Sequence, residues 1–134
     1  MTDLIEVKTA YLVGEALGWA VGKAEGLDLF LEPPGYNGVP WRVFARYRGE
    51  AIEHTKRYNP WEDWALCGAL QDKYVRLVER DADGDSCAIT WRSTSSREGE
   101  GWGGTTLEAV CRSVVDLITG DTVQVPKELI SCPD

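Results

Sequence analysis

Hydrophobic residues recur at three- and four-residue spacings in two parts of the chain, and this spacing predicts two main helices. The first spans residues 14–25 and is followed by Gly26, a residue suited to the left-handed conformation that ends a helix. The second begins after Thr105, which forms a capping box with Glu108, and Gly120 closes it. The apolar face of the second helix consists of Leu107, Val110, Cys111, Val114, Leu117 and Ile118.

Alternating apolar and polar residues predict strands between these helices. The predicted strands are residues 27–31, 39–47, 74–79 and 87–91. Asp83-Gly84 is a hairpin turn signal between the last two. The segment Ser93 to Gly104 is expected to be flexible, and Val123 and Val125 lie in an extended tail. Residues 58–64 are expected to form a loop entering a helical turn, with Asn59 as N-cap and Pro60 in the first helical position.

Strand hairpins flanked by helices favour an α+β fold, with a mostly antiparallel sheet of about four to five strands packed by two main helices. A chain of 134 residues is close to the usual size of one domain, so we expect a single domain over residues 1–134. Gly14, Gly18 and Gly22 recur every four residues along the first helix. This row of small residues allows a close neighbour, and internal packing is favoured over a dimer contact.

Charge and the N-terminal sequence restrict the partners of the protein. The net charge is −8, with 22 acidic and 14 basic residues, and such a field repels duplex nucleic acid. No apolar run is long enough for a membrane span. The acidic N-terminus lacks the features of a signal peptide, which indicates a cytoplasmic protein. We therefore expect Cys67, Cys87, Cys111 and Cys132 to be free thiols, with Cys111 in the core.

No motif supports an enzyme active site, a metal site or a cofactor. Gly99 to Gly104 reads G-x-G-x-x-G before a helix, but the strand and acidic residue of a dinucleotide-binding unit do not follow. The stretch Asp81 to Asp85 lacks the spacing of a calcium loop, and it is interpreted as a turn. His54 is the one histidine, and it lies in a polar stretch without a nucleophile motif. We expect no catalytic residues, no metal and no cofactor.

Tryptophan is unusually frequent, at six of 134 residues. Trp61, Trp64 and Trp102 lie in turn-rich segments, where burial in a small core is less assured. Exposed indole rings are stacking surfaces for nucleobases, and they are equally suited to anchoring a protein interface. Ordinary packing remains an interpretation of equal weight for each of the three.

Three segments together resemble the NinX-like family of phage proteins. Residues 13–26 are similar to the opening helix of the family, and Tyr58 to Gly68 is similar to its central Y-x-P-x-x-D-W segment. Thr106 to Val110 and Gly120 to Pro126 resemble its closing helix and tail. The family commonly has G-G-P after the D-W, where this chain has Cys67-Gly68-Ala69. The resemblance implies an accessory protein made during infection in the cytoplasm of a bacterial host.

These features favour a non-catalytic, anti-defence binding protein that sequesters a small nucleotide-type immune signal. The expected assembly is a homo-oligomer, because such pockets often lie between subunits. The alternatives are an acidic inhibitor that binds a host nuclease or immune effector, and a nucleotide-processing enzyme. In the first hypothesis, aromatic rings stack on the base, Asp63 binds its edge or the ribose, and a helix start with nearby arginines binds phosphate. The predicted ligand-binding residues are Trp61, Asp63, Trp64, Arg92, Arg97, Trp102, Gly104, Thr105 and Thr106.

Overall fold

A computed structural model describes residues 3–35, 40–48, 53–82, 89–95 and 99–130. This part of the chain forms three α-helices and three small antiparallel sheets. The helices are α1 (Gly14–Ala24), α2 (Trp64–Tyr74) and α3 (Thr106–Ile118). The strands are β1 (Leu4–Lys8), β2 (Asp28–Glu32), β3 (Arg42–Arg48), β4 (Glu53–Arg57), β5 (Val75–Ala82), β6 (Ile89–Ser95), β7 (Glu100–Gly103) and β8 (Thr122–Pro126). Short 3₁₀ helices follow β1 and β8, namely η1 (Thr9–Tyr11) and η3 (Lys127–Leu129). None of the described helices is long and apolar enough to cross a membrane.

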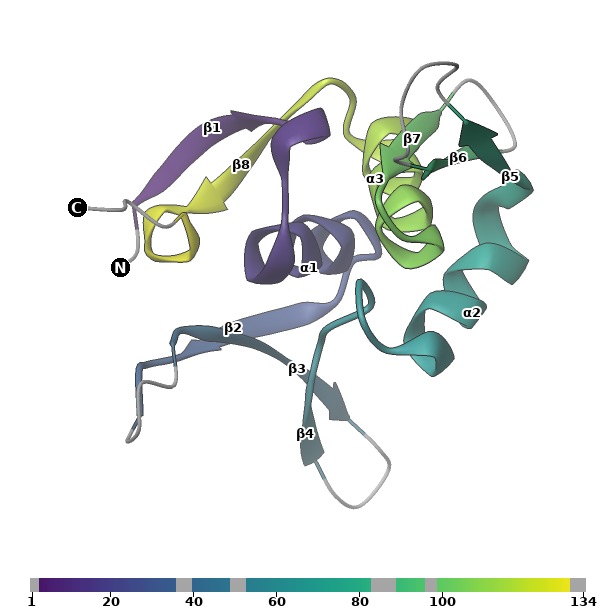
Figure 1. Ribbon diagram of the computed structural model, residues 1–134. Helices are drawn as coiled ribbons and strands as arrows, with labels where there is room; N and C mark the ends of the chain where they lie inside the picture. Colours follow the sequence, from purple (N-terminus) through teal and green to yellow (C-terminus); the bar gives the residue numbers. More distant parts are fainter. Residues whose placement is uncertain (1–2, 36–39, 49–52, 83–88, 96–98, 131–134) are drawn as a thin grey trace.

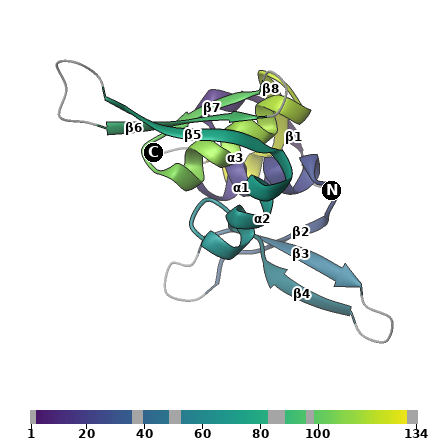
Figure 2. The ribbon, with the colours of Figure 1, turned by 90° about the vertical axis from the view of Figure 1, so that its right-hand side faces the viewer.

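The sheets pack on different sides of a central pair of helices, α1 and α3. Figure 1 shows α1 between the β1–β8 pair and the β2–β3–β4 sheet. The β5–β6–β7 sheet covers α3 on the far side of the molecule from β2–β3–β4 (Figure 2). The α+β class and the antiparallel pairing predicted from the sequence are confirmed. The strands are divided among three sheets instead of forming one, and α2 is a third helix.

The β1–β8 pair joins the two ends of the described chain. Its register runs from Leu4 opposite Pro126 to Lys8 opposite Thr122. Val125, predicted to be extended, is fully buried in β8 beside α1. The sequence analysis did not predict β1, because the apolar–polar alternation from Ile5 to Lys8 is only four residues long, and its side chains are mostly exposed.

Helix α1 uses two of its glycines to admit large neighbours. A Cβ atom at Gly18 would lie 2.4 Å from the ring of Trp61 and 2.9 Å from the carbonyl oxygen of Tyr58. At Gly22 it would lie 2.7 Å from the side chain of Leu29. All three distances are shorter than normal van der Waals contacts, so a larger residue at either position would have to displace these groups. The prediction of internal packing is confirmed for both positions. Gly26 has a φ of 76°, as expected for the residue after this helix.

The glycine-rich segment before α3 is largely a strand, and the prediction of a flexible Ser93–Gly104 segment is wrong for its described parts. Ser93 to Ser95 belong to β6, and residues 100–103 form β7. Gly99, Gly101 and Gly103 are buried against α3. A Cβ atom at Gly101 would lie 2.3 Å from the backbone nitrogen of Ser113 and 2.4 Å from the carbonyl oxygen of Ala109. The strand therefore lies directly on the helix backbone, and this contact orders a sequence that resembles a loop.

Helix α2 starts later than the sequence pattern suggested. Its N-cap is Asp63, whose Oδ1 accepts hydrogen bonds from the backbone nitrogens of Ala65 and Leu66 at 2.9 and 3.2 Å. The predicted helical turn after Asn59 is confirmed, but Asn59 is not the N-cap of α2 and Pro60 is not in its first turn. The carbonyl oxygen of Asn59 instead accepts from the backbone nitrogens of residues 62 and 63, which closes a turn before the helix. The capping box of α3 is confirmed, since Thr105 Oγ1 accepts from the backbone nitrogen of Glu108 at 3.1 Å.

The core lies where the three helices meet. Its fully buried side chains include those of Leu17, Val43 and Val110. Cys67 of α2 and Cys111 of α3 are both buried free thiols, as predicted. The hydrogen bond with Cys67, together with burial, raises the pKa of the Cys111 thiol, so this group is a neutral core residue. Cys87 and Cys132 lie outside the described residues.

Candidate functional site

A cavity of about 430 Å³ lies beside the indole ring of Trp102. We call it the Trp102 cavity, and segments that are distant in the sequence line it. They are the end of β1 and η1, strand β7, the middle of α3, and the start of β8. The lining residues are Lys8, Thr9, Ala10, Glu100, Gly101, Trp102, Arg112, Asp116, Asp121 and Thr122.

Trp102 is held in one orientation at this cavity. Because Gly101 and Gly103 face α3, the alternation of β7 turns Trp102 to the other side, where 43% of it is exposed. Its Nε1 donates a hydrogen bond to Glu100 Oε1 at 2.9 Å. The backbone nitrogen of Glu100 in turn donates to Asp116 Oδ2 at 3.0 Å, which ties β7 to α3. The indole is thus an exposed ring whose position is fixed before any ligand arrives.

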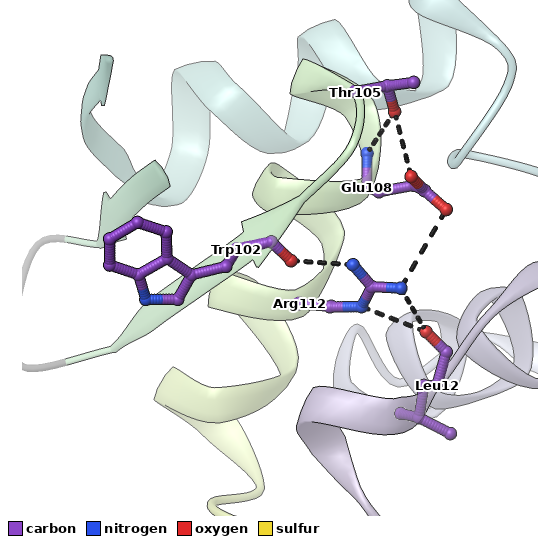
Figure 3. A network of polar contacts seen from close by, with 5 residues as sticks. All are labelled: Leu12, Trp102, Thr105, Glu108 and Arg112. Carbon is purple, nitrogen blue, oxygen red and sulfur yellow. Dashed lines mark hydrogen bonds and ion pairs between the residues drawn. The ribbon is translucent and has the colours of Figure 1, made fainter. Parts of the chain in front are cut away.

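Arg112 lines the Trp102 cavity and makes a network of polar contacts, which Figure 3 shows. Its Nε and Nη2 donate to the carbonyl oxygen of Leu12 at 3.0 and 2.8 Å, and its Nη1 donates to the carbonyl oxygen of Trp102 at 2.6 Å. Glu108 Oε2 lies 3.9 Å from Nη2. Figure 3 shows the Trp102 ring pointing away from this network. The buried guanidinium therefore joins α3, β7 and the segment before α1, and much of its donor capacity is already used.

The charges around the Trp102 cavity are mixed. Glu100, Asp116 and Asp121 contribute carboxylates, whereas Lys8 and Arg112 are cations. Lys8 is the more exposed of the two cations. Carboxylates accept hydrogen bonds from amino and hydroxyl groups, and they repel a ligand with several negative charges. The cavity therefore suits a planar ligand that carries hydrogen-bond donors and little negative charge.

The residues around Asp63 are arranged differently from the predicted stacking site. Trp61 is half-buried, with its ring against Gly18 and the guanidinium of Arg57 5.9 Å from the ring centroid. Asp63 caps α2 through its side chain. Trp64, in the first turn of α2, is 65% exposed. The three side chains are neighbours in sequence, but two of them have structural contacts and only Trp64 presents an open ring.

The start of α3, predicted to bind phosphate, already has a negative group nearby. Thr105 Oγ1 caps the helix, and the Glu108 carboxylate lies 3.5 Å from the same hydroxyl. Gly104 is exposed beside this carboxylate, and Thr106 is half-buried. A phosphate at this helix start would meet the charge of Glu108, which opposes the attraction of the helix N-terminus.

The two predicted arginines are only partly covered by the structure. The backbone of Arg92 lies in β6 opposite Trp102, but its side chain is outside the described part. Arg97 lies outside the described residues altogether, as does the Asp83-Gly84 turn. His54 is exposed on β4. Across the described ranges, no three His, Cys, Asp or Glu side chains are grouped as metal ligands.

Sequence reasoning identified Trp102 and missed the other residues of its cavity. Lys8 and Thr9 lie more than 90 positions before Gly101 in the sequence. A long-range contact holds them at the cavity: Thr9 Oγ1 donates to the carbonyl oxygen of Gly120 at 2.6 Å, across 111 positions. The sequence contains a weak indication that Asp116 belongs to a site, since it is a charged residue close to the apolar stripe of α3. The pairing of β1 with β8 assembles the rest.

A second, wider cavity of about 710 Å³ lies at the start of α1. We call it the Tyr11 groove. Tyr11 and Val13 on its border are 71% and 60% exposed. Glu128 Oε1 in its wall is buried and has no hydrogen-bond partner among the described residues. The lining residues are Val7, Tyr11, Val13, Gly14, Glu15, Ala16, Pro34, Pro40, Trp41, Glu128, Leu129 and Ile130.

Comparisons with known proteins identify the family of the chain. A search of curated proteins found no match. The family model described as bacteriophage P22 NinX matches residues 8–116, a span that includes α1, α2 and most of α3. It also includes Trp102, Arg112 and Asp116 of the Trp102 cavity. The chain therefore belongs to the NinX family of phage proteins.

Proposed function

We propose that this protein is a phage accessory protein that counters host defence by binding a small nucleotide-type signal without chemical conversion. The observation that carries the proposal is the exposed Trp102 indole beside a polar cavity, held by its hydrogen bond to Glu100. A ring fixed in this way loses little conformational entropy when a planar ligand stacks on it. Base–aromatic stacking contributes about 1–3 kcal/mol per base, which is enough to anchor a small ligand.

The charges of the Trp102 cavity narrow the ligand class. Its carboxylates are suited to the amino group of a base and the hydroxyl groups of a ribose. Lys8 supplies one exposed cation, so a single phosphate has a partner there. A triphosphate would bring several negative charges close to Asp116 and Asp121. The proposed ligand is accordingly a nucleoside or a nucleotide of low charge, and the proposed site moves from the Asp63 region to Trp102.

Isothermal titration calorimetry tests this proposal. The purified protein is titrated with nucleosides, cyclic mononucleotides, cyclic dinucleotides and nucleoside triphosphates at equal ionic strength. We expect measurable heat for at least one member of the first three groups, and weaker binding for the triphosphate of the same base. The proposal fails if no compound in the panel gives heat, or if the triphosphate is the tightest ligand.

A second candidate function, inhibition of a host protein, is favoured by the Tyr11 groove. Tyr11 and Val13 are large apolar side chains with most of their surface open to solvent, and aromatic residues are common anchors of protein interfaces. Glu128 adds a carboxylate to the lining of the groove, which suits a basic partner. The net charge of −8 adds to the attraction of a basic partner.

Affinity purification from infected cells separates the second candidate from the first. The comparison uses Tyr11→Ser and, as control, Leu77→Ser, because Leu77 is also exposed, at 48%, but lies on β5 away from the groove. A stoichiometric basic host protein that is lost with Tyr11→Ser and kept with Leu77→Ser supports inhibition. The groove is rejected as the docking site if both variants retain the same partner. It is also rejected if the unmodified protein retains no partner.

A further inference from the structure

The β2–β3–β4 sheet has one covered face and one open face. Leu29, Val43 and Ala45 are buried on the side that packs on α1. Figures 1 and 2 show the described helices on this side of the sheet and no described element on the other. Phe30 and Phe44 alternate with these buried residues, and they therefore belong to the open face, where both are half-buried.

Planar side chains form a continuous column on the open face. The rings of Phe30 and Phe44 face each other across the β2–β3 register, with centroids 5.7 Å apart and an interplanar angle of 27°. The guanidinium of Arg46 lies 4.3 Å from the centroid of Phe30, and that of Arg42 lies 5.5 Å from the centroid of Phe44. The order along the column is therefore Arg46, Phe30, Phe44 and Arg42, with a cation at each end.

Arg42 has hydrogen-bonding capacity that the rest of the described chain does not use. Its Nε is out of contact with solvent and has no acceptor among the described residues. Arg46, at the other end of the column, has the carboxylate of Asp28 at 3.5 Å. On the neighbouring strand, Arg57 pairs with Glu15 and lies 3.7 Å from Glu62. Glu32 lies opposite Arg42 in the β2–β3 register, but no described carboxylate is within ion-pair distance of Arg42. Of the three arginines, Arg42 is therefore the one that can pair with an external acceptor without displacing a described carboxylate.

The open face also belongs to the most basic part of an acidic protein. The three strands together have a net charge of +2, from five basic and three acidic residues, namely Arg42, Arg46, Arg48, Lys56, Arg57, Asp28, Glu32 and Glu53. The remaining residues carry the strong negative excess, since the net charge is −8. A local cationic surface on an anionic protein attracts a flexible anionic strand, whereas a rigid duplex also meets the surrounding acidic surface.

We propose that the open face of the β2–β3–β4 sheet binds single-stranded nucleic acid, in addition to the ligand proposed for the Trp102 cavity. Arg42 contacts a backbone phosphate through the terminal nitrogens of its guanidinium, whose planar fork suits phosphate oxygens. An unpaired base stacks on a guanidinium plane at an end of the column, a mode of recognition open only to bases outside a duplex. The planar groups favour this ligand over an acidic peptide, which supplies charge without a stacking surface.

Fluorescence anisotropy with labelled oligothymidylate and oligouridylate of about 12 nucleotides tests the assignment at low salt. The variant is Arg42→Gln, and the matched control is Arg76→Gln, which removes the same charge from an exposed position on β5. We expect Arg42→Gln to weaken binding about tenfold and Arg76→Gln to change it by less than about twofold. Circular dichroism and thermal unfolding verify that both variants are folded. Arg42→Lys, which keeps the charge and loses the planar group, is expected to bind with intermediate affinity.

Three results would overturn the proposal. The first is the absence of binding to either oligonucleotide, and the second is equal weakening by the Arg42 and Arg76 substitutions. The third is displacement of the oligonucleotide by poly-glutamate at the same concentration of negative charge, since this would make the face a general anion surface that favours an acidic protein partner. The two labelled strands separate the sources of the ligand, because a preference for oligouridylate over oligothymidylate indicates RNA as the favoured ligand.

Discussion

Trp61 and Trp102 both lie beside glycines, yet the glycines have opposite effects on the two rings. Gly18 lies on helix α1, where the missing side chain leaves a slot that receives Trp61. Gly101 lies on strand β7, where the missing side chain lets the strand backbone approach α3. The neighbouring Trp102 must then face the other way, and it stays 43% exposed. A glycine opposite an aromatic residue in space buries that residue, whereas glycines alternating with it along a strand expose it.

The largest expected effect concerns the strand glycine. Gly101→Ala places a Cβ atom within 2.4 Å of two backbone atoms of α3, and backbone cannot move aside as a flexible side chain can. We expect the free energy of unfolding to fall by about 3 kcal/mol or more in urea denaturation. Gly104→Ala is the control, because its new methyl group would have Glu108 Oε1 at 3.7 Å as its nearest neighbour. A loss of similar size in the control would contradict the close strand–helix contact.

The second-largest loss of stability is expected on removal of Arg112, which holds the strand of Trp102 against its neighbours. Arg112→Met leaves the carbonyl oxygens of Leu12 and Trp102 without their donor in a buried region. The free energy of unfolding should fall by about 2–3 kcal/mol. Arg76→Met, at an exposed position, should change it by less than about 0.5 kcal/mol. Equal stability of the two variants in urea denaturation would show that the guanidinium network does not hold these segments together.

Substitution of Gly18 on α1 should lower stability by a smaller amount, and substitution of Gly68 on α2 should raise stability. Gly18→Ala forces the Trp61 ring and the Tyr58 carbonyl away from α1, at a cost of about 1–2 kcal/mol. Gly68→Ala meets no atom within 4 Å in the interior of α2, so the better helix propensity of alanine should stabilise the protein by up to about 1 kcal/mol. Thermal unfolding of both variants measures the two signs. A stabilising Gly18→Ala would show that Trp61 does not occupy the slot.

Substitution of Asp63 should have the smallest effect, and it should change stability without changing ligand affinity. Asp63→Ala removes the acceptor for two backbone N–H groups of α2 and should cost about 1 kcal/mol. Asp63→Asn keeps a capping oxygen and should be nearly neutral. Neither variant should alter the affinity for a ligand of the Trp102 cavity, which Asp63 does not line. A loss of affinity in Asp63→Asn with unchanged stability would return the binding site to the Asp63 region.

Patterns within a single helix or turn were predictable from the sequence. The apolar stripes located α1 and α3, and Thr105 and Gly26 marked helix ends, because these features depend on residues a few positions apart. The strand β7 was not predictable in this way. Its glycines favour a loop until the backbone of α3 lies against them, which is a contact between elements. The same holds for β1, whose exposed residues gain a structure only by pairing with β8.

The candidate site was predictable only in part, for a similar reason. Sequence reasoning selected Trp102 as an unburied aromatic residue, but Trp61 carried the same signal and packs into the slot at Gly18. The partners of Trp102 in the cavity come from both ends of the described chain, and no local pattern connects Lys8 with Asp121. The sequence suggests a ligand role for Asp63 but does not reveal its capping role. That role depends on where α2 begins, and helix boundaries are poorly marked in sequence.

The most direct test of a binding site at Trp102 is calorimetry of Trp102→Ala beside Trp64→Ala, with the best ligand from the nucleoside and nucleotide panel. Both substitutions remove an exposed indole, but only Trp102 lines the cavity. The account predicts that Trp102→Ala weakens binding about tenfold or more, from the loss of base stacking, and that Trp64→Ala leaves the affinity unchanged. Equal affinities for Trp102→Ala and the unmodified protein, or a loss confined to Trp64→Ala, would contradict it.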